Sequence, residues 1–155
     1  MRAWFVAVFS VSAFLLSVQP ASAQFAAGYQ FLRFIDDGGE NIPQGWGASV
    51  AGGPGMIKLV GDVGGHYEDG GKLHTFQGGL EIAGAGARAT PFFRALAGGA
   101  KFSEGDTVFV FTPEVGVRVM GAGRVGAQVS AGFPIMRDEG ETAKAFRLFA
   151  GIVLR

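Results

Sequence analysis

The chain has 155 residues, which fits a single domain, and its formal net charge of zero gives no reason to expect a nucleic-acid surface. Charged residues make up only 17% and apolar residues 48%, whereas soluble domains usually carry about 25% charged residues. The lack of cysteine excludes disulfide scaffolds, thiol nucleophiles and cysteine-ligated metals. The chain is therefore unusually apolar, and the positions of its apolar residues show why.

Residues 1–23 have the layout of a secretory signal peptide. Arg2 supplies a positive start, residues 3–18 form an apolar run, and Ala21-Ser22-Ala23 is an A-x-A cleavage site. An uncleaved N-terminal anchor helix is the alternative. We expect cleavage, so that the mature chain begins at Gln24 and leaves the cytoplasm. Beyond Gln24 no run approaches the length of about 18 apolar residues that a membrane helix needs.

Turn-forming clusters divide residues 24–155 into eight segments of about ten residues each. The clusters fall at 36–41, 52–55, 68–71, 84–86, 103–106, 121–123 and 137–141. The segments between them are rich in Val, Phe, Ile, Leu or Ala, without helix signals. The odd-numbered clusters are acidic, and the others are short runs of Gly, Ala and Pro. Antiparallel hairpins would place every acidic loop at one end and every short turn at the other.

The segments alternate between an apolar face and a face of small or polar residues, as strands do. In residues 108–119, for example, Phe109 and Val115 share one face, and Glu114 and Arg118 share the other. Two architectures produce this alternation. A soluble barrel turns the apolar face inward and the polar face to water, whereas a membrane barrel turns the apolar face to lipid and the polar face to the lumen.

The polar face favours the membrane barrel. It consists mainly of Gly, Ala, Ser, Thr and Gln, whereas a solvated exterior is normally dense in charge. Small residues suit a narrow eight-strand lumen, which is only just wide enough for side chains to fill. The apolar face carries aromatic residues near many strand ends, as the lipid interfaces of barrels do; they are Phe25, Trp46, Tyr67, Phe93, Phe109, Phe133 and Phe146.

The isolated charges on the polar face carry both signs. Buried charges must be paired, so we predict an ion-pair network across the lumen, made of Lys58, Asp62, Glu81, Arg94, Glu114, Arg118, Arg124 and Arg147. Such a network either plugs the barrel or acts as a gate whose pairs exchange partners. We expect the structural plug, because a buried network resists rearrangement unless every member finds a new partner.

Other motifs favour structural interpretations. The run 121–126, GAGRVG, matches a dinucleotide turn, but residues 125–131 alternate at period two instead of forming the required helix, so we predict a hairpin turn. His66 and His74 differ in parity and are expected to face opposite ways, which disfavours a metal site. Pro113 cannot donate a ladder hydrogen bond, so we predict a bulge or local irregularity there. We expect no catalytic residue, cofactor or metal.

Residues 24–155 resemble the small outer-membrane β-barrel proteins, the family that includes the OmpA transmembrane domain and OmpX-like proteins. The resemblance is carried by the signal peptide, the eight alternating segments, the asymmetric loops and the closing segment 146–155, FRLFAGIVLR. It implies an all-β, eight-stranded antiparallel up-and-down transmembrane barrel in the outer membrane, with membrane lipids and the barrel-assembly machinery as partners. Family members commonly end on an aromatic residue that this machinery recognises, whereas this chain ends in Leu154-Arg155.

The family has no single activity, since its members serve as anchors, adhesins, narrow channels or lipid-modifying enzymes. We expect a non-enzymatic barrel that contributes to envelope integrity or surface interaction, with a narrow or gated channel left open. One alternative is a soluble periplasmic barrel that binds a small apolar ligand, which would place Arg118 and Arg147 in water. Another is a lipid-modifying enzyme, although Ser103, His74 and Glu68 show no spacing that marks a catalytic unit.

Overall fold

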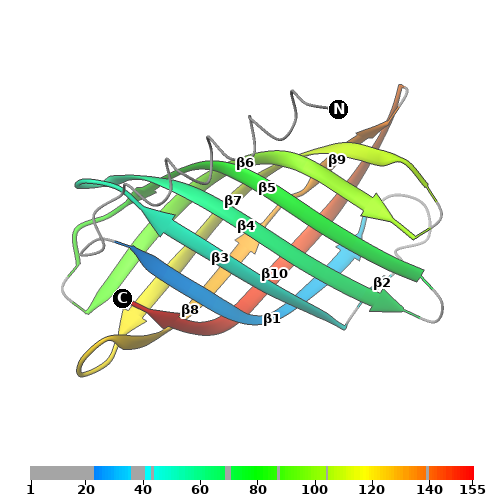
Figure 1. Cartoon of the computed structure of the whole chain (residues 1–155). Helices are drawn as coiled ribbons and strands as arrows, with labels where there is room; N and C mark the ends of the chain where they lie inside the picture. The colour runs from blue at the N-terminus through cyan, green and yellow to red at the C-terminus, as the bar shows by residue number, and fades with distance from the viewer. Residues whose placement is uncertain are drawn as a thin grey trace, which may run out of the picture.

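The computed structural model describes residues 23–35, 41–42, 44–68, 71–86, 88–103, 105–138 and 140–155. The described residues form ten strands and no helix (Figure 1). In particular, this part of the chain contains no helix long and apolar enough to cross a membrane. The signal peptide predicted at 1–23 lies, except for its last residue, outside the described residues.

The strands follow one another as antiparallel neighbours. Their bounds are β1 (Gln24–Phe34), β2 (Asn41–Ile42), β3 (Gly45–Gly52), β4 (Ile57–Glu68), β5 (Gly71–Ala83), β6 (Ala89–Phe102), β7 (Thr107–Met120), β8 (Val125–Gly132), β9 (Ile135–Asp138) and β10 (Glu141–Leu154). Strands β2 and β3 occupy one position beside β1, and β8 and β9 occupy one position between β7 and β10. The ten strands therefore fill eight positions in the sheet.

The sheet closes on itself because β1 pairs with β10 along its whole length, from Phe25 opposite Leu154 to Phe34 opposite Ala145. Closure leaves no long unpaired sheet edge among the described strands; only the two-residue β2 pairs on one side alone, with β1. The predicted eight-stranded antiparallel up-and-down barrel is confirmed. In Figure 1 the end of β4 and the start of β5, which flank one predicted acidic loop, lie at the right-hand end of the barrel, and the start of β1 and the end of β10 lie at the other end.

The predicted division into two faces is also confirmed, and it is the reverse of the facing that the soluble alternative requires. Val115 and Ile152 on the apolar face are 57% and 60% exposed. Arg118 and Arg147 on the polar face are only 1% and 3% exposed. The soluble barrel required the opposite arrangement. Its prediction is wrong because the interior is too narrow for the aromatic stripe and is filled by the smaller, polar face.

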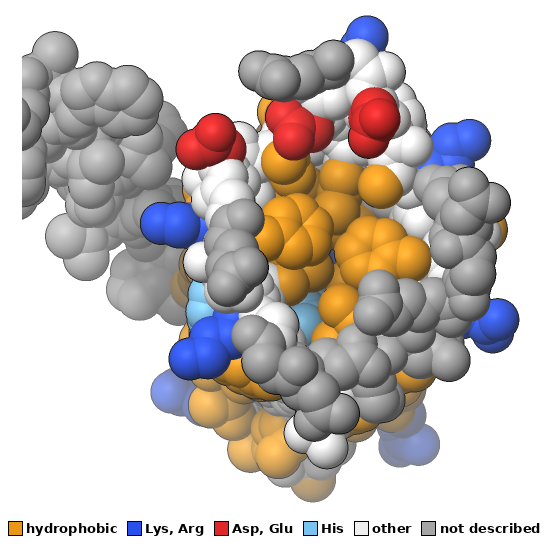
Figure 2. Space-filling view, turned by 90° about the vertical axis from the view of Figure 1, so that its right-hand side faces the viewer, with side chains coloured by type: hydrophobic (Ala, Val, Ile, Leu, Met, Phe, Trp, Pro, Cys, Tyr) orange, Lys and Arg blue, Asp and Glu red, His pale blue; other side chains and the backbone are white. Residues whose placement is uncertain are grey.

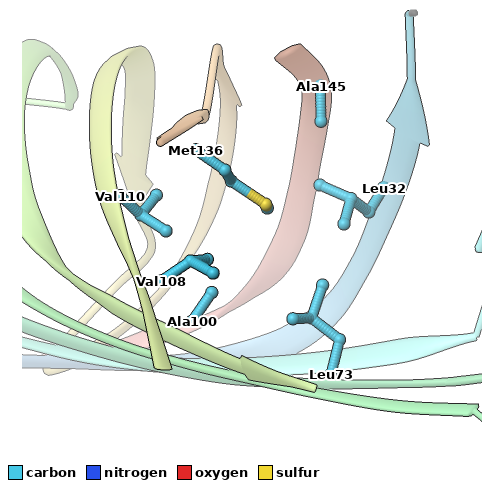
Figure 3. Close-up of a cluster of buried hydrophobic side chains, with 7 residues drawn as sticks. All are labelled: Leu32, Leu73, Ala100, Val108, Val110, Met136 and Ala145. Carbon is cyan, nitrogen blue, oxygen red and sulfur yellow. The ribbon is translucent and has the colours of Figure 1, made fainter. Parts of the chain in front are cut away.

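One end of the interior is apolar, which the alternation did not predict. Seven buried side chains meet in the halves of their strands nearest the acidic loops, and Figure 3 shows them pointing toward one another; they are Leu32, Leu73, Ala100, Val108, Val110, Met136 and Ala145. We call this set the apolar plug. Figure 2, which looks onto this end, shows apolar side chains across the mouth with acidic side chains beside them.

A shift in strand register adds Ile42 to the apolar plug. Tyr29 pairs with Trp46, but Leu32 pairs with Ile42, so one extra residue lies on the β2–β3 side between Ile42 and Trp46. Strict alternation from the outward-facing Trp46 would have turned Ile42 outward as well. Because one inserted residue reverses the face, Ile42 instead lies opposite Leu32 and packs against the apolar plug.

The bulge predicted at Pro113 is absent from the described strands. β7 is continuous, and its pairing with β6 keeps one register through Arg94 opposite Glu114, and Ala95 opposite Pro113. The carbonyl of Pro113 accepts a hydrogen bond of 2.9 Å from the N–H of Phe133. In such an antiparallel pair, the backbone N–H that Pro113 lacks would also have bonded to Phe133. The irregularity therefore appears across the ladder, as the break between β8 and β9 at residues 133–134.

The outward position of Val115 yields a test of which surface meets lipid. Val115→Arg is expected to lower the free energy of unfolding by about 2–4 kcal/mol, the cost of a cation near the middle of the hydrocarbon. Thr107→Arg, at the loop end of the same strand, is the matched control and should cost about 0–1 kcal/mol. Denaturant titration in phospholipid vesicles measures both. Equal effects of the two substitutions would contradict a lipid-facing belt.

Candidate functional site: the charged lumen

Six of the eight side chains predicted for the lumen network come together inside the barrel. They are Asp62 on β4, Glu81 on β5, Arg94 on β6, Glu114 and Arg118 on β7, and Arg147 on β10. All six are buried. Each lies on the inward face of its strand because inward and outward residues alternate, and neighbouring registers bring them to the same region of the lumen.

The first half of the network is centred on Glu81. Its carboxylate accepts hydrogen bonds from Arg94 Nε at 2.8 Å and from Arg118 Nη1 at 2.8 Å. Arg118 Nη2 also donates to Glu81, and Arg118 Nε donates to Gln128 Oε1 at 2.9 Å. Glu81 thus holds two guanidinium groups, one of them in a bidentate arrangement.

The second half is centred on Glu114. Arg94 Nη1 lies 3.2 Å from Glu114 Oε1, and Arg147 Nη2 donates to Glu114 Oε2. Arg147 Nη1 in turn donates to Asp62 Oδ1 at 3.0 Å. The six groups therefore form one chain in which charges alternate, Arg118–Glu81–Arg94–Glu114–Arg147–Asp62. We call it the ionic chain. It has three charges of each sign and no net charge.

An aromatic ring supports one end of the ionic chain. The guanidinium carbons of Arg94 and Arg118 lie 4.6 Å and 4.2 Å from the centre of the Phe92 ring. Each contact is within the range of a cation–π interaction. Gly116 makes room for this ring, since a Cβ added there would come within 2.4 Å of Phe92 Cζ. The ring therefore orients both guanidinium groups toward Glu81.

Lys58 and Arg124 do not join the ionic chain. Lys58 is half-buried near the short-turn end, and none of the ion pairs between described residues includes it. The prediction for Arg124 is wrong, because this residue is exposed in the β7–β8 turn. Its parity matched the inward face, but β8 begins only at Val125, so Arg124 lies past the end of the ladder.

Several neutral residues of the lumen were not singled out from the sequence. Gln77 Nε2 donates to Thr112 Oγ1 at 2.9 Å, and Ser49 Oγ lies 3.4 Å from Arg94 Nη1. Gln30 and Gln128 are also buried. In the sequence these residues occupy the same inward-facing alternate positions as the charged residues. Amides and hydroxyls occur on many surfaces, however, so their chemistry alone did not mark them as parts of this site.

The glycine run at 121–126 has the predicted hairpin geometry. β7 ends at Met120 and β8 begins at Val125, with Gly123 in a positive-φ conformation (φ 102°). A strand follows the turn, so there is no helix N-terminus to bind a pyrophosphate.

The other candidate groups do not converge. His66 is buried in the lumen, whereas His74 is exposed and packs edge-on against Tyr67 with ring centroids 5.8 Å apart. The described residues hold no group of three or more His, Cys, Asp or Glu able to bind a metal. Ser103 Oγ accepts a hydrogen bond of 3.3 Å from the backbone N–H of Lys72. Within the described chain, Ser103 and His74 therefore have other partners and do not form a nucleophile–base pair.

No family model matches the chain, and no curated protein matches its sequence. Solved structures do match its fold. Neisserial surface protein A (NspA) superposes with a TM-score of 0.73 at 11% identity, covering 85% of this chain and 96% of the other. The attachment invasion locus protein Ail of Yersinia pestis gives 0.55 at 13% identity, covering 86% and 98%.

The N-terminal β-barrel domain of Pseudomonas aeruginosa OprF gives a TM-score of 0.52 at 13% identity, covering 84% of this chain and 96% of that domain. The predicted resemblance to small outer-membrane β-barrels is therefore confirmed for the fold. The match spans nearly the full length of each neighbour, so this chain contains the whole of that fold. Identities of 11–13% establish the fold alone.

The ionic chain yields a test with an internal control. Glu81→Gln leaves two buried guanidinium groups facing a neutral amide, and breaking a buried pair costs about 3–5 kcal/mol of unfolding free energy. The double variant Glu81→Gln with Arg118→Gln removes one charge of each sign. The remaining Arg94, Glu114, Arg147 and Asp62 carry two positive and two negative charges. The double variant is therefore expected to recover part of the lost unfolding free energy.

Arg124→Gln is the matched control, because Arg124 is an exposed cation in the β7–β8 turn outside the ionic chain; it should change stability by no more than about 0.5 kcal/mol. Denaturant unfolding in detergent micelles, followed by tryptophan fluorescence, measures all three variants. If Glu81→Gln proves as stable as Arg124→Gln, the ionic chain does not stabilise the barrel.

Proposed function

We propose that the protein is a non-enzymatic integral outer-membrane barrel with a closed lumen, which contributes to envelope integrity and presents acidic loops at the cell surface. The observation that carries this proposal is the sidedness of the sheet. A continuous belt of outward-facing Phe, Val, Leu and Ile surrounds a buried charged interior. This distribution is favourable when lipid covers the belt and unfavourable in water, where so large an apolar surface would be exposed.

The closed lumen is supported by two independent layers. The apolar plug fills the half of the barrel nearest the acidic loops, and the ionic chain crosses the lumen beyond it. Ions crossing the barrel would have to part both layers. The ionic chain resists this because each carboxylate of its interior holds two guanidinium groups, which would lose their partners together. A gated channel is the second candidate, and it requires both layers to move.

The similarity to these solved structures supports a location of this protein in the outer membrane, at the cell surface. These neighbours include a Neisserial surface protein and Ail, an outer membrane protein of Yersinia pestis. We extend only the location to this chain, and not the attachment. Insertion would depend on the barrel-assembly machinery. Its recognition signal would be the closing strand β10, which pairs with β1.

Location and folding are tested together in a Gram-negative host. The full-length chain is expected in the outer-membrane fraction, and its mobility on a gel should shift on boiling because a closed barrel stays folded in detergent until heated. Val115→Arg serves as the control, since a destabilised belt should lower the temperature of the shift. Recovery in the soluble periplasmic fraction without a shift would exclude the membrane barrel.

The closed lumen is tested by electrical recording. Purified barrel incorporated in a planar lipid bilayer is expected to give no steady stepwise current at either polarity, because the apolar plug and the ionic chain block the path. Protein from the same preparation is run on a gel with and without boiling. A mobility shift shows that the barrel used for the recording is folded. Regular single-channel steps from the wild-type protein would contradict a closed lumen and establish the channel instead.

A further inference from the structure

Two prolines remove hydrogen bonds from one small area of the barrel wall. The N–H of Phe133 donates to the carbonyl of Pro113 at 2.9 Å. On the other side of the same segment, the N–H of Ala145 donates to the carbonyl of Pro134 at 2.9 Å. Such antiparallel pairs normally exchange a second hydrogen bond in the opposite direction. Proline has no N–H group, so both return bonds are missing and the carbonyl of Phe133 faces β7 without a donor.

This carbonyl has no other hydrogen-bond partner among the described residues. Phe133 takes part in backbone hydrogen bonds as a donor only. Pro113, which it faces, lies within the apolar belt, between the exposed outward-facing side chains of Phe111 and Val115. Hydrocarbon tails cannot donate hydrogen bonds, so an unpaired carbonyl is costly in this position. A molecule that brings a donor to this point would remove that cost.

A pocket on the outer face lies over the contact between Pro113 and Phe133, and its volume is about 290 Å³. Outward-facing side chains from four neighbouring positions of the sheet line it; they are Phe93, Pro113, Val115, Ala131, Phe133 and Phe146. Three of the six are phenylalanines. Ala131, which pairs with Val115, is the smallest side chain of the set and keeps the floor of the pocket low. The pocket therefore combines aromatic walls with one unpaired acceptor.

The chemistry of the pocket defines its ligand. The ligand needs a hydrogen-bond donor, because the carbonyl of Phe133 is an acceptor; the acyl chain of a membrane lipid has none. Aromatic rings pack on phenylalanine side chains in offset or edge-to-face arrangements. A rigid ring also loses less conformational entropy on binding than a flexible chain. A charged ligand is disfavoured, because the pocket offers no counter-charge within the hydrocarbon.

We propose that this pocket binds an uncharged aromatic molecule that carries one hydroxyl or N–H donor and enters from the membrane. The ring packs against the phenylalanine side chains, and the donor bonds to the carbonyl of Phe133. This rests on the proposed function, because it takes the outer face to be covered by lipid. The barrel then has a binding site for small amphipathic aromatic compounds that requires no opening of the lumen.

The sequence allows the carbonyl of Phe133 to be observed alone. Of the six prolines, only Pro134 follows a phenylalanine. Labelling phenylalanine with ¹³C at the carbonyl and proline with ¹⁵N therefore gives one correlated NMR signal, from the Phe133–Pro134 peptide bond. The full barrel in lipid nanodiscs is titrated with 2-naphthol. Naphthalene, which has the same rings without the hydroxyl, is the matched probe, and both are compared at measured concentrations in the bilayer.

In the wild-type barrel, 2-naphthol is expected to move the Phe133 carbonyl signal in a saturable way. Naphthalene should leave the signal in place and should displace 2-naphthol only at about tenfold higher concentration or more, because it cannot make the hydrogen bond. An unmoved signal at saturating 2-naphthol would overturn the proposal. Displacement by naphthalene at equal concentration would do so as well.

Two variants test the two parts of the site. Pro113→Ala restores the N–H that faces Phe133, and Ala131→Leu fills the pocket. Each should weaken 2-naphthol binding about tenfold or more. Without ligand, Pro113→Ala should already move the Phe133 signal in the direction that 2-naphthol produces. Ala127→Leu, at an exposed outward position of the same strand outside the pocket, is the matched control and should bind like the wild type.

The boiling shift verifies that each variant is a folded barrel. If Pro113→Ala lacks the shift, Ala131→Leu decides the outcome on its own. Binding by the folded variants that equals binding by Ala127→Leu would contradict the pocket. The shift also keeps the two proposals separate. A wild-type chain that is soluble and shows no shift removes the membrane barrel itself, whereas a folded membrane barrel whose Phe133 signal ignores 2-naphthol removes only the pocket.

Discussion

The interior of this barrel depends on the alternating contact between three arginines and three carboxylates. A lipid-facing belt forces the polar face of every strand into a narrow space with little water, where an isolated charge is costly. The ionic chain meets this constraint because each interior member has a partner on either side, from Arg118 at one end to Asp62 at the other. Five different strands contribute, so the same contacts hold together the sheet that encloses them.

The two ends of the barrel differ in chemistry because the two kinds of connection differ. On the acidic-loop side, the apolar plug lies in the lumen. The ionic chain crosses the middle of the lumen, and Phe92 and a second apolar cluster of Ala26, Phe149 and Val153 lie beyond it, toward the short turns. A membrane presents different headgroups and solutions to its two sides, so a barrel with this polarity can hold one fixed orientation.

The alternation of residues predicted the faces of most strands. It failed where an extra residue shifted the strand register and where a residue lay beyond the end of a strand. Arg124 had inward parity, yet it lies in the turn before β8. Ile42 faces inward only because an extra residue precedes Trp46. Pro113 stays in a regular strand because its missing donor faces the break between β8 and β9. Such features depend on pairing between strands, which a period of two within one strand does not contain.

The sequence by itself determined the barrel, its strand count, its two faces and the residue types of its lumen, because turn chemistry and period-two patterning are local properties of the chain. Only the tertiary structure decided which charges meet. Arg147 and Asp62 are far apart in sequence and contact one another because closure and register bring β10 and β4 to the same region of the lumen. Closure likewise gathered Leu32 and Met136 into the apolar plug. Contacts across a closed sheet depend on the alignment of all its strands, and no single segment specifies that alignment.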